Sequence, residues 1–284
     1  MKKIEAAEKF LTAHLDLFKC PICQQPFADL ADRSMVCPNN HRFDLSKKGT
    51  LYFLTKKFSG EYDGAMLQAR RQILQAGLFD KIIETVAKQL PNQSQTILDI
   101  GCGEGTPLNK LIQLRNSRDA GVGFDISKPG IELANNQEQP SFFCVADLAA
   151  LPFNADSFDI IFDLFSPSAY KEFERVLKPT GKLIKVVPNS NYLMELRHLL
   201  YPSDSQNSSY SNQKVVDLFA QHYPNYQRID LEYQFAIPAG QQANLLLMTP
   251  LHWGQGQREV SATELASLKS ITVAVTLLIQ TATN

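Results

Sequence analysis

The sequence predicts an α/β fold with a parallel sheet, preceded by a small metal-binding module. Three observations support this prediction. Apolar segments alternate with helical patterns up to Val187, a Gly-rich turn follows the first apolar segment at 96–106, and paired Cys and His residues lie near the N-terminus. Alternation of this kind is typical of a parallel sheet covered by helices. A chain of 284 residues has room for one large domain and one small one.

The Gly-rich turn carries the first site prediction. The segment 96–106, TILDIGCGEGT, indicates a buried strand that ends at Asp99 and is followed by Gly101, Gly103 and Glu104. Glycine lets the backbone approach a ligand closely. The spacing differs from the dinucleotide fingerprint, and an acid at position 99 would repel a pyrophosphate but could hold a cationic amino group. The turn resembles the first motif of the Rossmann-like methyltransferases that depend on S-adenosylmethionine (SAM). The alternative is an ordinary strand-turn-helix of another α/β protein.

Two further acids follow apolar segments in the same way. Asp125 ends the segment 122–126 about 20 residues after the turn, where an acid can bind both ribose hydroxyls. Asp147 ends the segment 142–147, at the place where methyltransferases contact the adenine amine. The segment 175–183, RVLKPTGKL, resembles the methyltransferase turn that opens the fifth strand. Three acids in register are hard to explain as solvated loop residues.

Four residues near the N-terminus predict a zinc site. Their spacing is C-x2-C-x13-C-x3-H, and they are Cys20, Cys23, Cys37 and His41. Cys3His is a common ligand set for structural zinc. A hairpin that turns near 29–33 would join the two pairs, and metal binding would supply folding energy that so small a core lacks. The alternative is three buried thiols and a surface histidine. The other two cysteines, Cys102 and Cys144, are expected to be packing residues in a chain without disulfides.

Charge is distributed unevenly along the chain. Residues 19–57 carry a net charge of +4, whereas the whole chain carries −1. This asymmetry suggests a nucleic-acid surface at the basic end, and Phe43, Tyr52 and Phe53 could stack on bases. The alternative is a solvated face on a module that docks onto the large domain. The candidate RNA-binding residues are Arg42, Lys47, Lys48, Lys56 and Lys57.

The same patterns suggest four parts. These are a helical extension at 1–18 that reaches residue 17 or 18, a zinc-binding module at 19–57, linker helices at 58–90, and a methyltransferase domain at 91–284. Strands are expected at 229–237 and, antiparallel, at 271–279. The sequence has no membrane-spanning stretch and no signal-peptide pattern, so we expect a cytoplasmic protein.

A zinc cluster ahead of a methyltransferase core resembles the bacterial 23S ribosomal RNA guanine-N1 methyltransferases (RlmA/RrmA). The pieces that carry the resemblance are CPIC, CPNNHRFD, MLQARRQILQAG, LDIGCGEG, GFDISK, FCVADLAALPF, RVLKPTGKL, NYLMELRHLLY and LLLMTP. The resemblance implies one zinc ion at the four ligands, SAM at the Gly-rich turn and the acids, and closure of the cofactor site by Phe79 and Tyr192. The family often has His where this chain has Tyr192. It also tends to form dimers whose zinc modules flank an RNA cleft.

The implied reaction is methyl transfer to N1 of a guanine in a hairpin loop of 23S ribosomal RNA. The N1 proton needs an acceptor, and Asp163, after the fourth strand, is the candidate base. Phe165 is the candidate for stacking on a flipped base. Two other classes stay open: a methyltransferase for small metabolites, and a non-catalytic RNA-binding protein with a SAM fold.

Overall fold

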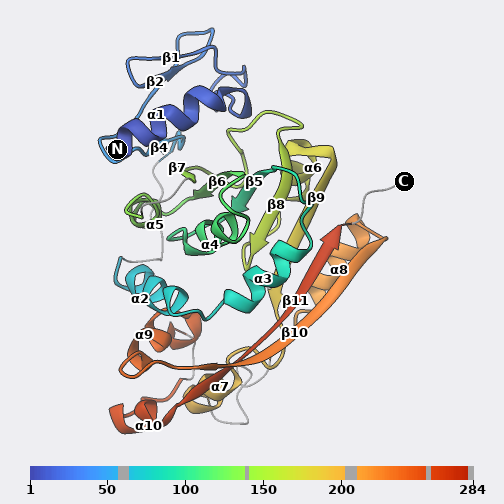
Figure 1. The fold of residues 1–284 in the computed structure, drawn as a ribbon. Helices are drawn as coiled ribbons and strands as arrows, with labels where there is room; N and C mark the ends of the chain where they lie inside the picture. The colour runs from blue at the N-terminus through green and yellow to red at the C-terminus, as the bar shows by residue number, and fades with distance from the viewer. Residues whose placement is uncertain (57–63, 138–140, 202–209, 254–256, 281–284) are drawn as a thin grey trace.

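The computed structural model describes residues 1–56, 64–137, 141–201, 210–253 and 257–280. Its centre is an eight-stranded sheet with the order β10-β11-β9-β8-β5-β6-β7-β4 (Figure 1). The strands from β4 to β9 pair in parallel, whereas β11 is antiparallel to both β9 and β10. The strands are β4 (Leu51–Tyr52), β5 (Thr96–Ile100), β6 (Ala120–Asp125), β7 (Phe142–Val145), β8 (Phe158–Leu164), β9 (Leu177–Pro188), β10 (Tyr226–Ala236) and β11 (Ser270–Gln280). The predicted parallel sheet and antiparallel last strand are confirmed.

Helices cover both faces of this sheet, and two apolar cores result. Alternate residues of a strand point to opposite faces, so Ile97 packs in one core and its neighbour Leu98 in the other. One core includes α2, α3 and α4, and the other includes α6 and α8. The helices are α1 (Lys3–Ala13), α2 (Gly64–Gln75), α3 (Asp80–Lys88), α4 (Thr106–Leu114), α5 (Lys128–Ala134), α6 (Tyr170–Val176), α7 (Met194–Leu200), α8 (Gln213–His222), α9 (Gln242–Leu247) and α10 (Ala262–Ser267), with short 3₁₀ turns η1 (Leu15–Leu17) and η3 (Pro250–Trp253).

The N-terminal module has its own antiparallel sheet. It contains β1 (Asp29–Ala31), β2 (Ser34–Val36) and β3 (Arg42–Asp44) in that order. Asp32 and Arg33 join β1 to β2, and both have positive φ angles, as a tight two-residue hairpin turn requires. The predicted hairpin near 29–33 is therefore confirmed.

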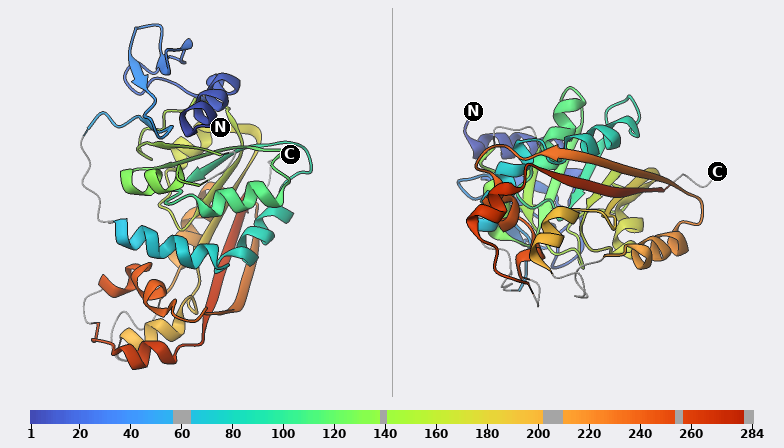
Figure 2. Two further views of the ribbon diagram at one scale, coloured as in Figure 1. Left: turned by 60° about the vertical axis from the view of Figure 1, so that its left-hand side comes forward. Right: turned by 90° about the horizontal axis from the view of Figure 1, so that it is seen from below.

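The module and the large sheet are joined by backbone pairing. Leu51 of β4 lies opposite Cys144 of β7 in parallel register, and the N–H of Phe53 donates to the carbonyl of Val145 at 2.9 Å. The segment that ends the predicted zinc module is thus also the edge strand of the methyltransferase sheet (Figure 1). The left view of Figure 2 shows the N-terminal module, in blue, at the end of the molecule opposite the red C-terminal helices.

The N-terminal extension packs against both parts. Helix α1 ends at Ala13, and a 3₁₀ turn replaces the last turn of the expected helix. The ring of Phe10 stacks on Phe142 of β7 at 5.4 Å, and Phe18 meets the same ring edge to face at 5.7 Å. Leu11 and Phe18 are fully buried. Residues 1–18 therefore pack between the small module and the face of the large sheet at β7. Among the residues described, no helix is long and apolar enough to cross a membrane.

Candidate metal centre and active site

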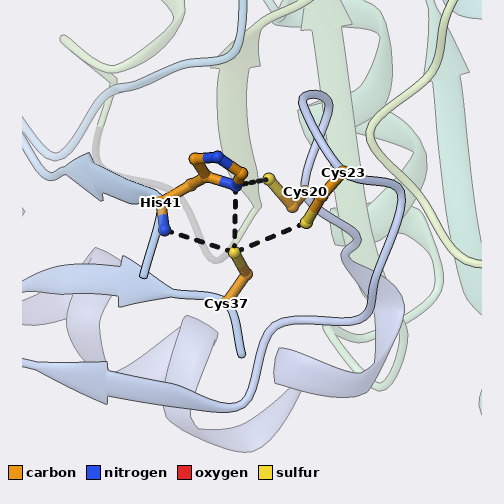
Figure 3. Close-up of side chains that lie close together, drawn as sticks. All are labelled: Cys20, Cys23, Cys37 and His41. Atoms are coloured by element: carbon orange, nitrogen blue, oxygen red, sulfur yellow. Dashed lines mark hydrogen bonds between the residues drawn. The ribbon is translucent and has the colours of Figure 1, made fainter. Parts of the chain in front are cut away.

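The two Cys/His pairs meet in one cluster (Figure 3). One ligand atom from each of Cys20, Cys23, Cys37 and His41 lies within 4.8 Å of all the others. The Nδ1 atom of His41 is 3.5 Å from Cys20 Sγ and 3.3 Å from Cys37 Sγ, and the Sγ atoms of Cys23 and Cys37 are 3.6 Å apart. A tetrahedron built on normal Zn–S and Zn–N bonds has edges of about 3.5–3.8 Å, within a few tenths of an ångström of these distances. The donor set and its spacing therefore fit one zinc ion.

Tight turns present these ligands. The N–H of Gln24 donates to the carbonyl of Cys20, and the N–H of His41 donates to Cys37 Sγ at 3.3 Å. A hydrogen bond from the backbone N–H of Gln25 lowers the pKa of the Cys23 thiol to about 6. Burial raises the pKa of Cys20 to about 11, a cost that a bound cation offsets by holding the thiolate. All five cysteines are free, and Cys102 and Cys144 are buried in the core as expected.

A cavity of about 920 Å³ opens at the carboxyl ends of β5, β6 and β8. Ligands of open α/β sheets bind at this end of the strands. We call one part of its wall the glycine side, which contains Gly101, Gly103, Asp125, Ser127 and Asp147. We call the other part the lysine side, which contains Phe165, Ser166, Lys185, Tyr192 and Lys214.

The Gly-rich turn forms the floor of the glycine side. Gly101 has a φ of +62°, and a Cβ there would lie 2.3 Å from Ser166 Oγ. Gly103 has a φ of +55°, but a Cβ there would meet nothing within 4 Å. A side chain at 103 would therefore project into open space beside the turn, where the bare backbone lets a ligand come close.

Asp125 and Asp147 are placed as the sequence predicts. The carboxylate of Asp125 accepts hydrogen bonds from Gly103 N at 2.9 Å and Ser127 N at 2.7 Å, and it lines the cavity. Burial raises its pKa, although these backbone N–H groups oppose the shift. Asp147 also lines the cavity and accepts from Ala149 N at 2.9 Å. Both carboxylates are held in fixed orientations at adjacent strand ends.

Asp99 lies deeper. It is 2% exposed, and its Oδ2 atom has no hydrogen-bond partner within the described ranges. Burial raises its pKa well above the usual range, and the neighbouring carboxylates Asp163 and Asp125 add to this effect. A buried carboxylate oxygen without a donor is unfavourable. An unpartnered carboxylate oxygen suits a ligand that brings a cationic N–H group, as SAM does, but Asp99 is not part of the cavity wall, so its contact with a cofactor remains a prediction.

The carboxylate of Glu104 points away from the cavity, unlike those of Asp125 and Asp147. Its buried carboxylate accepts from Arg71 Nε at 3.3 Å and from the hydroxyl of Thr106 at 2.6 Å. It ties helix α2 to the start of α4 and is not part of the cavity wall. Its contact with a cofactor remains a prediction.

Three aromatic rings close the lysine side. Phe165 meets Phe79 edge to face at 5.5 Å and Tyr192 at 5.2 Å. Phe165 and Tyr192 line the cavity, whereas Phe79 is fully buried behind Phe165. Phe165 has a φ of +64°, a strained conformation for a residue of this size, and such strain is concentrated at functional sites. The structure thus places these three predicted site residues side by side, and Phe79 contacts the cavity only through Phe165.

Asp163 lies beneath the cavity wall. It is fully buried, and it accepts from Lys185 Nζ at 2.7 Å and from Ser166 N at 3.1 Å. Burial raises its pKa to about 6, against the attraction of Lys185. Lys185, which the sequence analysis missed, lines the cavity in its place. The signal was a lysine inside the otherwise apolar segment LIKVV of β9.

Arg70 of α2 is a second cavity residue that the sequence analysis missed. Its guanidinium lies 5.8 Å from the centre of the Phe79 ring, and its charge opposes the rise in pKa of Asp99 and Asp125. It comes from the predicted linker helix, so this helix contributes directly to the cavity.

The basic residues of the module are mostly free to meet a partner. Arg42, Lys47, Lys48 and Lys56 are exposed, and Lys57 lies outside the described residues. Lys48 Nζ is 3.0 Å from Glu132 of α5, so its charge is already paired. The expectation that Phe53 stacks on bases is wrong: it is 4% exposed and packs against Phe18. Tyr52 is 39% exposed, but the ammonium group of Lys128 already lies 5.4 Å from the centre of its ring, so its stacking on a base remains a prediction.

Comparison with known proteins agrees with this arrangement. A family model described as a methyltransferase domain matches residues 91–236, and one described as the N-terminal zinc ribbon of RlmA matches residues 18–55. A putative 23S rRNA (guanine-N1)-methyltransferase of Bacillus subtilis is 37% identical over 94% of this chain and 98% of its own. The 23S rRNA (guanine(748)-N1)-methyltransferase of Streptomyces fradiae is 25% identical over 91% of this chain and 94% of its own.

Solved structures show the same fold. A phosphoethanolamine N-methyltransferase of Haemonchus contortus, in complex with phosphomonomethylethanolamine and S-adenosylhomocysteine, matches with a TM-score of 0.51. The match has 14% identity and covers 79% of this chain and 59% of that chain. At this identity the likeness concerns the fold alone.

Proposed function

This chain belongs to the family of 23S ribosomal RNA (guanine-N1)-methyltransferases, and on that basis we propose that it methylates N1 of a guanine in a hairpin loop of 23S ribosomal RNA. The chain is a SAM-dependent methyltransferase with an N-terminal zinc ribbon. The observation that carries the proposal is the two-sided cavity. Its glycine side suits SAM, and its lysine side offers aromatic rings to a nucleobase.

The residues that would hold SAM follow from their chemistry. The unpartnered oxygen of Asp99 suits the ammonium group, Asp125 suits the ribose hydroxyls, and Asp147 suits the adenine amine. SAM supplies an activated methyl group on a sulfonium. The protein then has to align the nucleophile with the S–methyl bond and exclude water, which is the work of a fixed cavity.

RNA would be bound outside the cavity as well. The exposed residues Arg42, Lys47 and Lys56 give the zinc module a basic face, and Lys57 follows them in the sequence. Lys214 and Arg197 add positive charge on the cavity wall. We further propose that the protein acts as a homodimer whose zinc modules flank the RNA, and that it does so in the cytoplasm.

Primer extension tests the proposed function, because a methyl group at N1 blocks base pairing and stops reverse transcription. Large-subunit RNA from a strain that lacks this gene should have lost one stop within a hairpin loop. Incubation of that RNA with the purified protein and SAM should restore the stop. The Asp125→Ala variant, which lacks the carboxylate proposed to bind the ribose of SAM, should restore it much more slowly.

The opposite results separate the alternatives. If the parent protein binds SAM but leaves every guanine of this RNA unmodified, ribosomal RNA is not its substrate, and methylation of a metabolite would support the small-molecule alternative. If it does not bind SAM in calorimetry, the chain is a binding protein with a methyltransferase fold.

A further inference from the structure

We propose that Lys185 donates a hydrogen bond to O6 of the target guanine and thereby favours loss of the N1 proton. This inference rests on the proposed function, because it assigns a role within that reaction. In this mechanism Asp163 does not accept the N1 proton itself. Instead, the positive charge of Lys185 makes the N1 proton of the guanine easier to remove.

The position of Lys185 is set by the sheet. It lies in β9, directly opposite Asp163 of β8 in the parallel register, where both strands run toward the cavity. The side chain is 2% exposed, yet it forms part of the cavity wall. A lysine so deeply buried is rare unless it is paired, and one that also reaches a cavity is placed to meet a ligand.

The hydrogen bonds of Lys185 leave one donor available. Its Nζ donates to Asp163 Oδ2 and to the carbonyl of Ser166, both at 2.7 Å. An ammonium group has three N–H donors, and these two bonds are the ones it makes within the part of the chain that the structure describes. The third donor suits a neutral or anionic oxygen in the cavity, such as a guanine O6.

The ionisable groups around Lys185 come from several elements. Asp163 of β8 is its direct partner, with Lys185 Nζ 2.7 Å from Asp163 Oδ2. Other ionisable groups line the same cavity, and these are Arg70, Asp125, Asp147, Tyr192, Arg197, Tyr210 and Lys214. Asp163 itself cannot reach a substrate in this arrangement, because it is fully buried and both of its oxygens are engaged.

The reaction balances with water as the proton acceptor. The N1–H bond breaks, its proton passes to water at the cavity mouth, and the electron pair left on N1 is shared with O6. The N–H of Lys185 stabilises this charge on O6 in a site shielded from bulk solvent, where such bonds are strongest. N1 then bonds to the methyl carbon while the carbon–sulfur bond breaks. That bond's electron pair goes to sulfur, which leaves neutral S-adenosylhomocysteine.

The test compares Lys185→Gln with the parent protein in single-turnover methylation of an unmethylated 23S ribosomal RNA transcript at several pH values. At neutral pH the variant should be about 100-fold slower, the size of effect expected for losing a positioned group that assists proton transfer. The deficit should shrink as pH rises, because hydroxide then removes the proton. SAM affinity in calorimetry should be unchanged.

Two further measurements separate catalysis from structure. The double variant Lys185→Gln/Asp163→Asn removes both buried charges together, so it avoids leaving an unpaired carboxylate and should fold even if the single variant does not. A transcript made with 6-thioguanosine has a more acidic N1 proton. With this transcript, the methylation rates of variant and parent should differ less than with the guanosine transcript.

Several results would overturn the inference. It fails if the variants match the parent at neutral pH, if their deficit is the same at every pH and with 6-thioguanosine, or if they lose SAM binding to the same degree as activity. If the parent itself transfers no methyl group to the transcript, the proposed function fails first, and that result is distinguishable from the others.

Discussion

The zinc cluster and the cofactor cavity are assembled in opposite ways. All four metal ligands lie within 22 residues and are presented by tight turns. The cavity wall, in contrast, collects side chains from Met66 to Leu251 and depends on the packing of the whole sheet. A single substitution of a ligand can therefore abolish the metal site. The cavity should tolerate single substitutions, unless they remove a residue that contacts the ligand.

The two regions also differ in what stabilises them. The cavity rests on two extensive cores that cover both faces of the large sheet. The small sheet has only short strands of three residues, and its buried residues pack partly against α1 and β7. A module of this size depends on its metal for folding energy.

Loss of zinc should produce the largest effect. Cys23→Ser removes one ligand, and we expect the purified variant to contain no zinc and to have an unfolded N-terminal module. Metal binding contributes about 10–16 kcal/mol in zinc-finger peptides, far more than so small a core can replace. Zinc content by mass spectrometry and limited proteolysis measure this.

Cys144→Ala is the control, because it removes a thiol that lies outside the cluster. It should retain one zinc per chain. A metal-free Cys23→Ser protein whose N-terminal module still resists proteolysis would show that the cluster is not what holds the module together.

Removal of a cavity ligand should have the next largest effect. Asp125→Ala deletes the carboxylate that would bind the ribose hydroxyls, with hydrogen bonds to a charged acceptor worth about 1.5–3 kcal/mol each. SAM affinity in calorimetry should fall at least tenfold while the zinc content stays unchanged. Asp29→Ala changes an exposed acid of β1, and this variant should bind SAM as the parent does. If both variants bind SAM with equal affinity, Asp125 does not contact the cofactor and serves only to orient the turn through its hydrogen bonds to Gly103 and Ser127.

Two glycines of one turn should respond differently. Gly105→Ala places a Cβ at 2.8 Å from the Phe143 ring at a φ of +83°, so it should lower the unfolding free energy by about 1–3 kcal/mol. Gly103→Ala meets no neighbour and should cost about 1 kcal/mol of stability or less, yet weaken SAM binding severalfold. Thermal unfolding and calorimetry separate the two effects. If Gly103→Ala binds SAM normally, the turn does not face the cofactor.

Neutralising the basic face should have the smallest effect. Changing Lys47, Lys56 and Lys57 to Gln should weaken RNA binding and flatten its salt dependence, because each phosphate contact releases counterions. Lys48→Gln alone should change RNA binding less, since Lys48 is already paired with Glu132. SAM affinity should be unaffected. A triple variant that methylates RNA as well as the parent at every salt concentration would exclude the module as the RNA-binding element.

The local patterns of the chain predicted what local geometry determines. The Cys/His spacing predicted the metal cluster, and apolar segments that end in acids predicted Asp125 and Asp147 on the cavity wall. Asp125 and Asp147 do line the cavity, because parallel strands end at the same edge of a sheet, but their contact with SAM remains a prediction. The hairpin at Asp32 and Arg33 was also predictable, because a turn of two residues depends on neighbouring residues alone.

Contacts between distant segments were not predictable in this way. The pairing of Asp163 with Lys185 spans 22 residues and two strands, so Asp163 looked like an exposed strand-end acid. Phe53 looked like a free aromatic beside basic residues, but β4 pairs with β7 and buries it. The pairing of Glu104 with Arg71 of the preceding helix α2 was likewise not visible in the sequence, and a contact of Glu104 with the cofactor remains a prediction.

The short strand β4 has a consequence for the fate of the protein when zinc is scarce. Leu51 and Tyr52 cover the edge of β7, which would otherwise present unpaired N–H and C=O groups. Uncovered edges of this kind are templates for pairing with other chains. If unfolding of the metal-free module frees this edge, zinc starvation would expose the unpaired backbone groups of β7 on a core that is still folded. The metal would then act as a safeguard against aggregation as well as a structural ion.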